Sequence, residues 1–189
     1  MDIIELILND SEDGVNAISV VENPAIEVDF VALKGHEKVR FKAIDEEKRI
    51  LMGAILIPNK PIYRRDGDSE YYIYFTQETV LKASQMYLKK GYQNKSTLEH
   101  ESPITGINLV ESWIIDDPEK DKSALYGFNL PKGTWFGTMK VDNDEIWDNY
   151  VKTGKVKGFS IEGFFASKEK DPEEEAQATL NKIKEMLGK

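Results

Sequence analysis

The sequence predicts a mainly β fold of the α+β class. Segments rich in branched and aromatic residues recur along the chain, and turn-forming Gly, Pro, Asn and Asp residues separate them. Apolar residues with helical spacing occur in few places, so repeated strand-helix-strand units are not expected. At 189 residues the chain is long enough to bury a core of its own.

The N-terminal third is expected to form short strands at 3–8, 28–33, 39–44 and 50–57. In the third of these, apolar residues at alternate positions indicate one buried face. The fourth is apolar almost throughout, which is typical of a central strand. Residues 15–27 combine apolar side chains with Pro24, so we expect an arm there rather than part of the core.

A helix is expected to follow a strand at 71–75. Thr76 can cap its N-terminus, and Gly91 can end it after two lysines. Its apolar side would contain Val80, Ala83, Tyr87 and Leu88.

Further along, strands are expected at 107–115 and before Val141. Asp142 or Asn143 then caps a short helix, and the chain returns directly to a strand around Ser160.

The last part of the chain changes in character. A charge run after residue 166 indicates a linker, and 173–187 has the apolar stripe of an amphipathic helix. We therefore divide the chain into an N-terminal strand and arm (1–27), a main domain (28–166) and a charged linker with a C-terminal helix (167–189).

The composition excludes several functions. The net charge of −9, with lysines interleaved among acids, argues against nucleic-acid binding, which needs clustered Lys and Arg. The absence of Cys excludes thiol catalysis and Cys-ligated zinc. No apolar stretch is long enough to span a membrane, and residues 1–5 lack the basic start of a signal peptide, so we expect a cytoplasmic location. The acidic loop at 116–122 lacks the spacing and glycine of a calcium loop, so neither a metal nor a cofactor is expected.

Ser160 stands at the centre of a short apolar segment between Gly158 and Gly163, a suitable place for a nucleophile. A serine hydroxyl needs a base to take its proton, and the sequence offers only His36 and His100. His36 lies in a charged turn, which is typical of a solvated residue. His100 is therefore the candidate base.

Glu111 could orient His100. Alternation in the strand at 107–115 places Glu111 on one face with Leu109 and Trp113. A carboxylate among apolar side chains needs a partner, and a protonated histidine is one. The alternative is that this face is exposed to solvent.

Five motifs follow one another in a specific order: His100, Val110-Glu111-Ser112-Trp113, Gly133-Thr134-Trp135, Ile146-Trp147, and Lys157-Gly158-Phe159-Ser160-Ile161-Glu162-Gly163. Their order and spacing resemble the prohead maturation proteases of tailed bacteriophages, in the branch that includes the T4-type prohead core protease and the XkdF-like proteins. The resemblance spans about residues 14–165, and no single motif within it is decisive.

This resemblance implies a β-barrel with surrounding helices, similar to herpesvirus assemblin, and a serine endopeptidase that cleaves scaffold and capsid proteins inside the prohead, in the host cytoplasm. The family's nucleophile maps onto Ser160 and its base onto His100. Herpesvirus relatives use a second histidine after the serine, which this sequence lacks. We choose Glu111 for the third role, with Asp116 and Glu101 as alternatives.

Members of the family tend to cut after glutamate, which suits a basic substrate-binding subsite, and the candidates for it are Arg64, Arg65 and Lys157. The segment ending at Glu27 is itself a candidate for self-cleavage. The C-terminal helix could bind the scaffold or a second protease subunit.

The chief alternative is a non-enzymatic capsid-assembly or scaffold component with an inactive protease-like barrel. Ser160 and His100 within hydrogen-bond reach would favour the enzyme, whereas Ser160 packed in the core would favour the assembly component.

Overall fold

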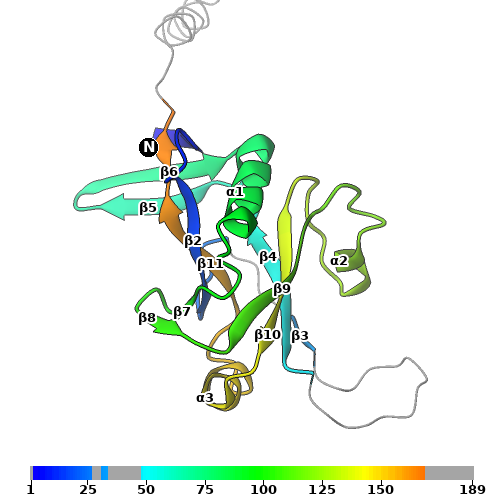
Figure 1. Cartoon of the computed structure of the whole chain (residues 1–189). Coiled ribbons are helices and arrows are strands. Elements are labelled where there is room, and N and C mark those ends of the chain that lie inside the picture. Colours follow the sequence, from blue (N-terminus) through cyan, green and yellow to red (C-terminus); the bar gives the residue numbers. More distant parts are fainter. Residues whose placement is uncertain (1, 27–30, 34–47, 169–189) are drawn as a thin grey trace, which may run out of the picture.

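The computed structural model describes residues 2–26, 31–33 and 48–168, whose strands form three four-stranded sheets (Figure 1). The outer sheet contains, in spatial order, β12 (Ala166–Ser167), β1 (Asp2–Ile7), β6 (Ser69–Phe75) and β5 (Ile62–Asp66). The central sheet contains β3 (Val31–Leu33), β4 (Ile50–Leu56), β10 (Trp135–Val141) and β9 (Ile107–Ile114). The serine sheet contains β11 (Gly158–Phe164), β2 (Gly14–Val21), β7 (Ser96–Leu98) and β8 (Ser102–Ile104).

Two of the strand pairs are parallel, β1 with β6 and β2 with β7, and the other pairs are antiparallel. The helical elements are α1 (Gln77–Lys89), α2 (Lys122–Leu125), α3 (Asp144–Ile146) and η1 (Trp147–Val151), the last a turn of π-helix.

The apolar core lies among the three sheets and α1. Strand β4 is buried at every residue after its first, which confirms the predicted central strand at 50–57. The largest buried side chains include Trp135 of β10, Trp147 of η1 and Tyr87 of α1. The rings of Tyr87 and Trp135 meet edge to face, with centroids 5.6 Å apart.

Helix α1 begins as the sequence predicts, because the Thr76 side chain accepts a hydrogen bond from the backbone N–H of Thr79 at 3.3 Å. Val80, Ala83 and Tyr87 are buried as expected, but Leu88 is exposed. The buried stripe runs through positions three and four residues apart, and it is completed by Ser84 rather than by Leu88.

The interpretation of residues 15–27 as an arm is wrong for its first part. Residues 14–21 form β2, which lies between β11 and β7 in the serine sheet. Ile18 and Val20 are fully buried, and Pro24 comes after the strand has ended, so it does not interrupt the pairing.

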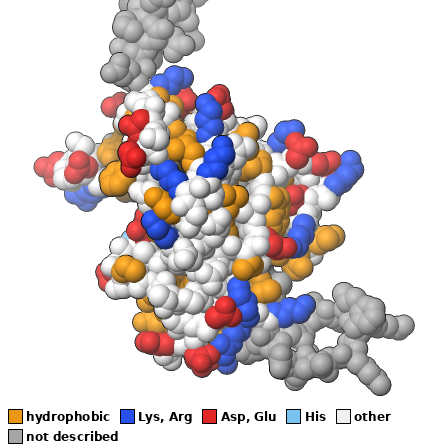
Figure 2. Space-filling model, viewed as in Figure 1, with side chains coloured by type: hydrophobic (Ala, Val, Ile, Leu, Met, Phe, Trp, Pro, Cys, Tyr) orange, Lys and Arg blue, Asp and Glu red, His pale blue; other side chains and the backbone are white. Residues whose placement is uncertain are grey.

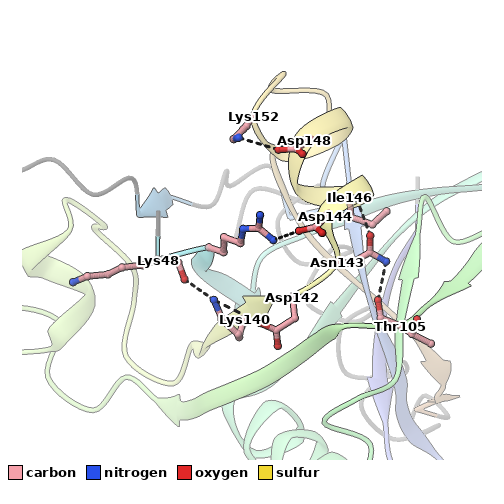
Figure 3. Close-up of polar contacts among 10 residues, drawn as sticks. Lys48, Thr105, Lys140, Asp142, Asn143, Asp144, Ile146, Asp148 and Lys152 are labelled. Carbon is pink, nitrogen blue, oxygen red and sulfur yellow. Dashed lines mark hydrogen bonds and ion pairs between the residues drawn. The ribbon is translucent and has the colours of Figure 1, made fainter. Parts of the chain in front are cut away.

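Polar contacts tie one end of the central sheet to α3 (Figure 3). Arg49, just before β4, forms an ion pair with Asp144. Asn143 caps α3: its Oδ1 accepts from the Ile146 N–H at 3.0 Å, and its Nδ2 donates to the Thr105 carbonyl at 3.0 Å. This corner fixes the path of the chain between β10 and the serine strand β11.

The predicted class, α+β and mainly β, is confirmed, but the described strands form open sheets and no closed barrel. The expected strand at 39–44 and helix at 173–187 lie outside the described residues. No helix in the described part of the chain is long and apolar enough to cross a membrane. Acidic and basic side chains are interspersed over the face seen in Figure 2.

Candidate active site

Ser160 lies in β11 between Phe159, which is fully buried in the apolar core, and Ile161, which packs against that core. Because side chains alternate along a strand, Ser160 and Glu162 share the opposite face of the serine sheet. Ser160 is 7% exposed. The strand predicted around this serine is therefore confirmed, and it presents two polar side chains in succession on one face.

A bulge directly follows these two residues. The pairing of β11 with β2 shifts register between Glu162 and Gly163. A Cβ at Gly163 would lie 2.0 Å from the carbonyl oxygen of Gly14, so only glycine allows this close approach of the two backbones. Bulges of this kind re-aim neighbouring side chains, and this one adjoins Glu162.

Three hydroxyl-bearing residues form a row across the sheet. Ser160 lies opposite Ser19 of β2, and Ser19 lies opposite Thr97 of β7. Directly opposed residues share a face, with Cβ atoms about 5 Å apart. The row therefore leads from the candidate nucleophile toward the turn that follows β7.

That turn carries His100. It joins β7 to β8, and both Glu99 and His100 have positive φ, at 50° and 61°. Left-handed conformations of non-glycine residues cost free energy and persist only where surrounding contacts hold them. Here the backbone N–H of His100 donates to Ser19 Oγ at 3.1 Å, and Glu99 Oε1 accepts from the Glu22 N–H at 2.7 Å.

The imidazole of His100 contacts Glu162. Its Nδ1 lies 3.2 Å from Glu162 Oε1, and the same carboxylate oxygen accepts a hydrogen bond from the Thr97 hydroxyl. The His100 and Glu162 side chains are 41% and 31% exposed, so this end of the polar face is open to solvent. A carboxylate can only accept, so a hydrogen bond at this contact requires a proton on Nδ1, and in the neutral imidazole Nε2 is then an acceptor.

Ser160 and His100 share this polar face but do not hydrogen-bond to each other. Within the described residues no side chain or backbone group hydrogen-bonds to Ser160 Oγ. Every fully buried side-chain N or O atom in that part of the chain has a hydrogen-bond partner, so Ser160 Oγ is not fully buried. The hydroxyl of Ser160 therefore keeps contact with solvent. Catalytic hydrogen bonds are often long or absent before a substrate binds.

The structure places Glu111 elsewhere, in β9 of the central sheet. Both of its carboxylate oxygens lie 2.7 Å from Lys122 Nζ, and one accepts from Thr138 at 2.6 Å. These hydrogen bonds, Lys122 first, lower the pKa of Glu111 below its ordinary value. Its side chain is 44% exposed, so this face of the strand is open to solvent at Glu111.

Asp116 and Glu101 also have surroundings that do not suit the third role. Asp116 lies 2.7 Å from Lys132 Nζ and is largely exposed. Glu101 is exposed in the turn just before β8, where its backbone N–H bonds to the carbonyl of Leu98. In the described part of the chain, the carboxylate in contact with the His100 ring is that of Glu162.

Two of the three basic residues proposed for substrate binding line one cleft. This cleft of about 700 Å³ is bounded by Arg64 from β5, by Lys157 just before β11 and by residues 22–25. Burial lowers the pKa of the Arg64 guanidinium, which also lines a smaller cleft beside Ile161 and Gly163. Arg65 instead bonds to the carbonyl of Gly67 in its own hairpin.

Sequence reasoning missed Glu162, Ser19 and Thr97. Glu162 could have been found, because a residue two positions after Ser160 in a strand shares its face. Ser19 and Thr97 gave no comparable signal, since their proximity depends on strand pairing far apart in the chain.

No group of three or more His, Asp or Glu side chains that could hold a metal ion occurs within residues 2–26, 31–33 and 48–168. The arrangement that stands out is instead a serine, an imidazole and a carboxylate on one sheet face, the types of side chain that acyl transfer uses. No family model matches this sequence, and neither a curated protein nor a solved structure shows significant similarity to it.

Proposed function

We propose that this protein is a serine endopeptidase that cleaves scaffold and capsid proteins during maturation of a phage prohead. One observation carries the proposal: Ser160 and Glu162 lie on one face of the serine sheet, and Nδ1 of His100 lies 3.2 Å from Glu162 at that face. The order of the five motifs from His100 to Gly163 supports the choice of substrate class.

In the proposed reaction, Nε2 of His100 takes the Ser160 proton as Oγ attacks the scissile carbonyl carbon. The protonated imidazole then donates to the leaving amine, and water repeats the cycle on the acyl-enzyme. Glu162 takes the third role in place of Glu111, because it contacts the imidazole and can stabilise its positive charge.

The cleft beside Arg64 and Lys157 is the proposed binding site for an acidic substrate side chain. Lys157 Nζ lies 3.8 Å from Glu22 Oε1, so a carboxylate already neighbours this group within the chain. Glu27, the proposed self-cleavage residue, lies outside the described residues. We also propose that the three open sheets are a variant of the β-barrel of herpesvirus assemblin.

A non-enzymatic assembly component is the second candidate, and one observation favours it. Ser160 is only 7% exposed and forms no hydrogen bond with His100 in the described structure. A substrate peptide would have to bring the two groups together, whereas a scaffold component would not need them to meet.

The test is cleavage of a purified procapsid scaffold protein, followed by mass spectrometry. The parent chain is compared with Ser160→Ala, His100→Ala and Glu162→Gln, and Glu111→Gln is the matched control because it removes the same charge from another sheet. We expect the first two variants to be inactive and Glu162→Gln to lose roughly 10²- to 10⁴-fold in kcat. Glu111→Gln should cleave as the parent does.

If Ser160→Ala and His100→Ala cleaved as fast as the parent, the enzyme proposal would be refuted and the assembly component would take its place. If Glu111→Gln were inactive and Glu162→Gln active, the protease would stand with Glu111 as its third residue.

A further inference from the structure

Ser19 is a fully buried polar side chain between the nucleophile and the base. Ser19 is 0% exposed, and its hydroxyl donates to the Thr97 carbonyl at 3.3 Å. A serine hydroxyl has one proton, and that of Ser19 is donated to Thr97. Toward His100 the Ser19 oxygen is therefore an acceptor, and it accepts from the His100 backbone N–H at 3.1 Å. Both partners of Ser19 thus belong to the segment that carries His100.

This acceptor helps to hold a backbone in an uncommon conformation. Glu99 and His100 both have positive φ, and Glu99 is not one of the residue types, Gly, Asn, Asp and His, that adopt it more often. The left-handed pair turns the chain back from β7 to β8. Loss of the Ser19 hydroxyl would leave the His100 N–H without this partner, and the turn could relax toward ordinary φ values.

Thr97 acts on the imidazole through Glu162. Its hydroxyl donates to Oε1 of Glu162, the same oxygen that contacts Nδ1 of His100. Thr97 is itself buried, and its β-branched side chain has restricted rotamers. One carboxylate oxygen is therefore fixed by a rigid donor at the point where the imidazole approaches.

We propose that Ser19 and Thr97 are positioning residues for His100, an inference that rests on the proposed protease function. Ser19 fixes the backbone that carries the imidazole, and Thr97 fixes the carboxylate that selects its Nδ1–H tautomer. Together they leave Nε2 as the acceptor for the Ser160 proton. Neither residue touches the reacting atoms.

The first test reads the imidazole directly and needs no activity. The chain has two histidines, so His36→Gln leaves His100 as the only imidazole, and ¹⁵N-histidine NMR reports its tautomer. The Nδ1–H form should dominate in this parent, and Thr97→Val should move the signals toward a mixture of tautomers. Thr97→Ser keeps the hydroxyl and should restore the parent spectrum.

The second test reads catalysis in the same variants. Ser19→Ala and Thr97→Val should lower kcat by about 10- to 100-fold with little change in KM, because a small misplacement of a catalytic group slows the chemical step. Thr97→Ser should recover most of the rate. Ser84→Ala is the control, since it also removes a buried serine hydroxyl, one that bonds within α1 to the Leu81 carbonyl.

The outcomes separate the positioning role from the protease function. If the parent has the Nδ1–H tautomer, Thr97→Val loses it and the parent cleaves nothing, the protease function is refuted and the positioning role is kept. An active parent whose Ser19→Ala and Thr97→Val variants match it in tautomer and kcat would overturn the positioning alone. A rate loss in Ser84→Ala as large as that in Ser19→Ala would also overturn it, because the effect would then be general destabilisation.

Discussion

Gly163→Ala should be among the most destabilising single-methyl additions in the chain. The added Cβ would lie 2.0 Å from the Gly14 carbonyl oxygen and 2.9 Å from the Val15 Cα. A carbon and an oxygen normally approach no closer than about 3.3 Å, so β2 and β11 would have to separate by roughly 1.3 Å at this point. The nearest atoms are backbone, so no side chain can rotate away.

Overpacking of this kind costs about 1 to 3 kcal/mol, and the rigid neighbours place Gly163→Ala at the upper end, about 3 kcal/mol. For a chain of this length the expected fall in Tm is roughly 6–12 °C. Unfolding by urea and by heat, followed by circular dichroism, measures both quantities. All variants should carry Ser160→Ala, so that self-cleavage cannot contribute.

Gly67→Ala is the matched control. Gly67 has φ of +57°, and nothing lies within 4 Å of an added Cβ there. This variant should cost only the left-handed conformation of an alanine, about 1 kcal/mol. If Gly163→Ala were no less stable than Gly67→Ala, the close approach of Gly163 to Gly14 would not constrain the strand.

Three further predictions concern stability. Glu111→Gln should lose no more than about 1 kcal/mol at neutral pH. The folded state lowers the pKa of Glu111 below its ordinary value of 4.5, so the stability difference between the parent and Glu111→Gln should disappear as the pH falls below 4.5 and the carboxylate is protonated. Urea midpoints measured across pH test this. A stability difference that persisted at pH 2 would contradict it. Burial raises the pKa of Tyr87 above its ordinary value of 10.0, so only the unfolded state ionises at first and stability should fall as pH rises above 10. Tyr87→Phe should reduce that alkaline loss in the same titration, and an unchanged slope would count against the burial argument. Asn143→Ala should cost about 1 kcal/mol in Tm-derived stability through loss of the helix cap. Asn143→Asp should restore only part of it, because aspartate keeps an oxygen to accept from the Ile146 N–H but cannot donate to the Thr105 carbonyl.

Local pattern predicted much of the secondary structure. The strand at 50–57, the capped helix after Thr76 and the strand around Ser160 follow from apolar spacing and turn residues that act over a few positions. Residues 14–21 were misjudged because Pro24 suggested an irregular segment, although it lies beyond the strand. In that segment strand pairing with β11 and β7 outweighed the local signal.

The candidate site shows the same division. The sequence by itself pointed to Ser160, which stands in an apolar segment between two glycines, and to His100, because only two histidines could serve as its base. Only the tertiary structure placed Glu162 against the imidazole and put Glu111 on another sheet with Lys122. The physical reason is that strand register, set by pairing between segments from opposite ends of the chain such as β2 and β11, decides which side chains share a face.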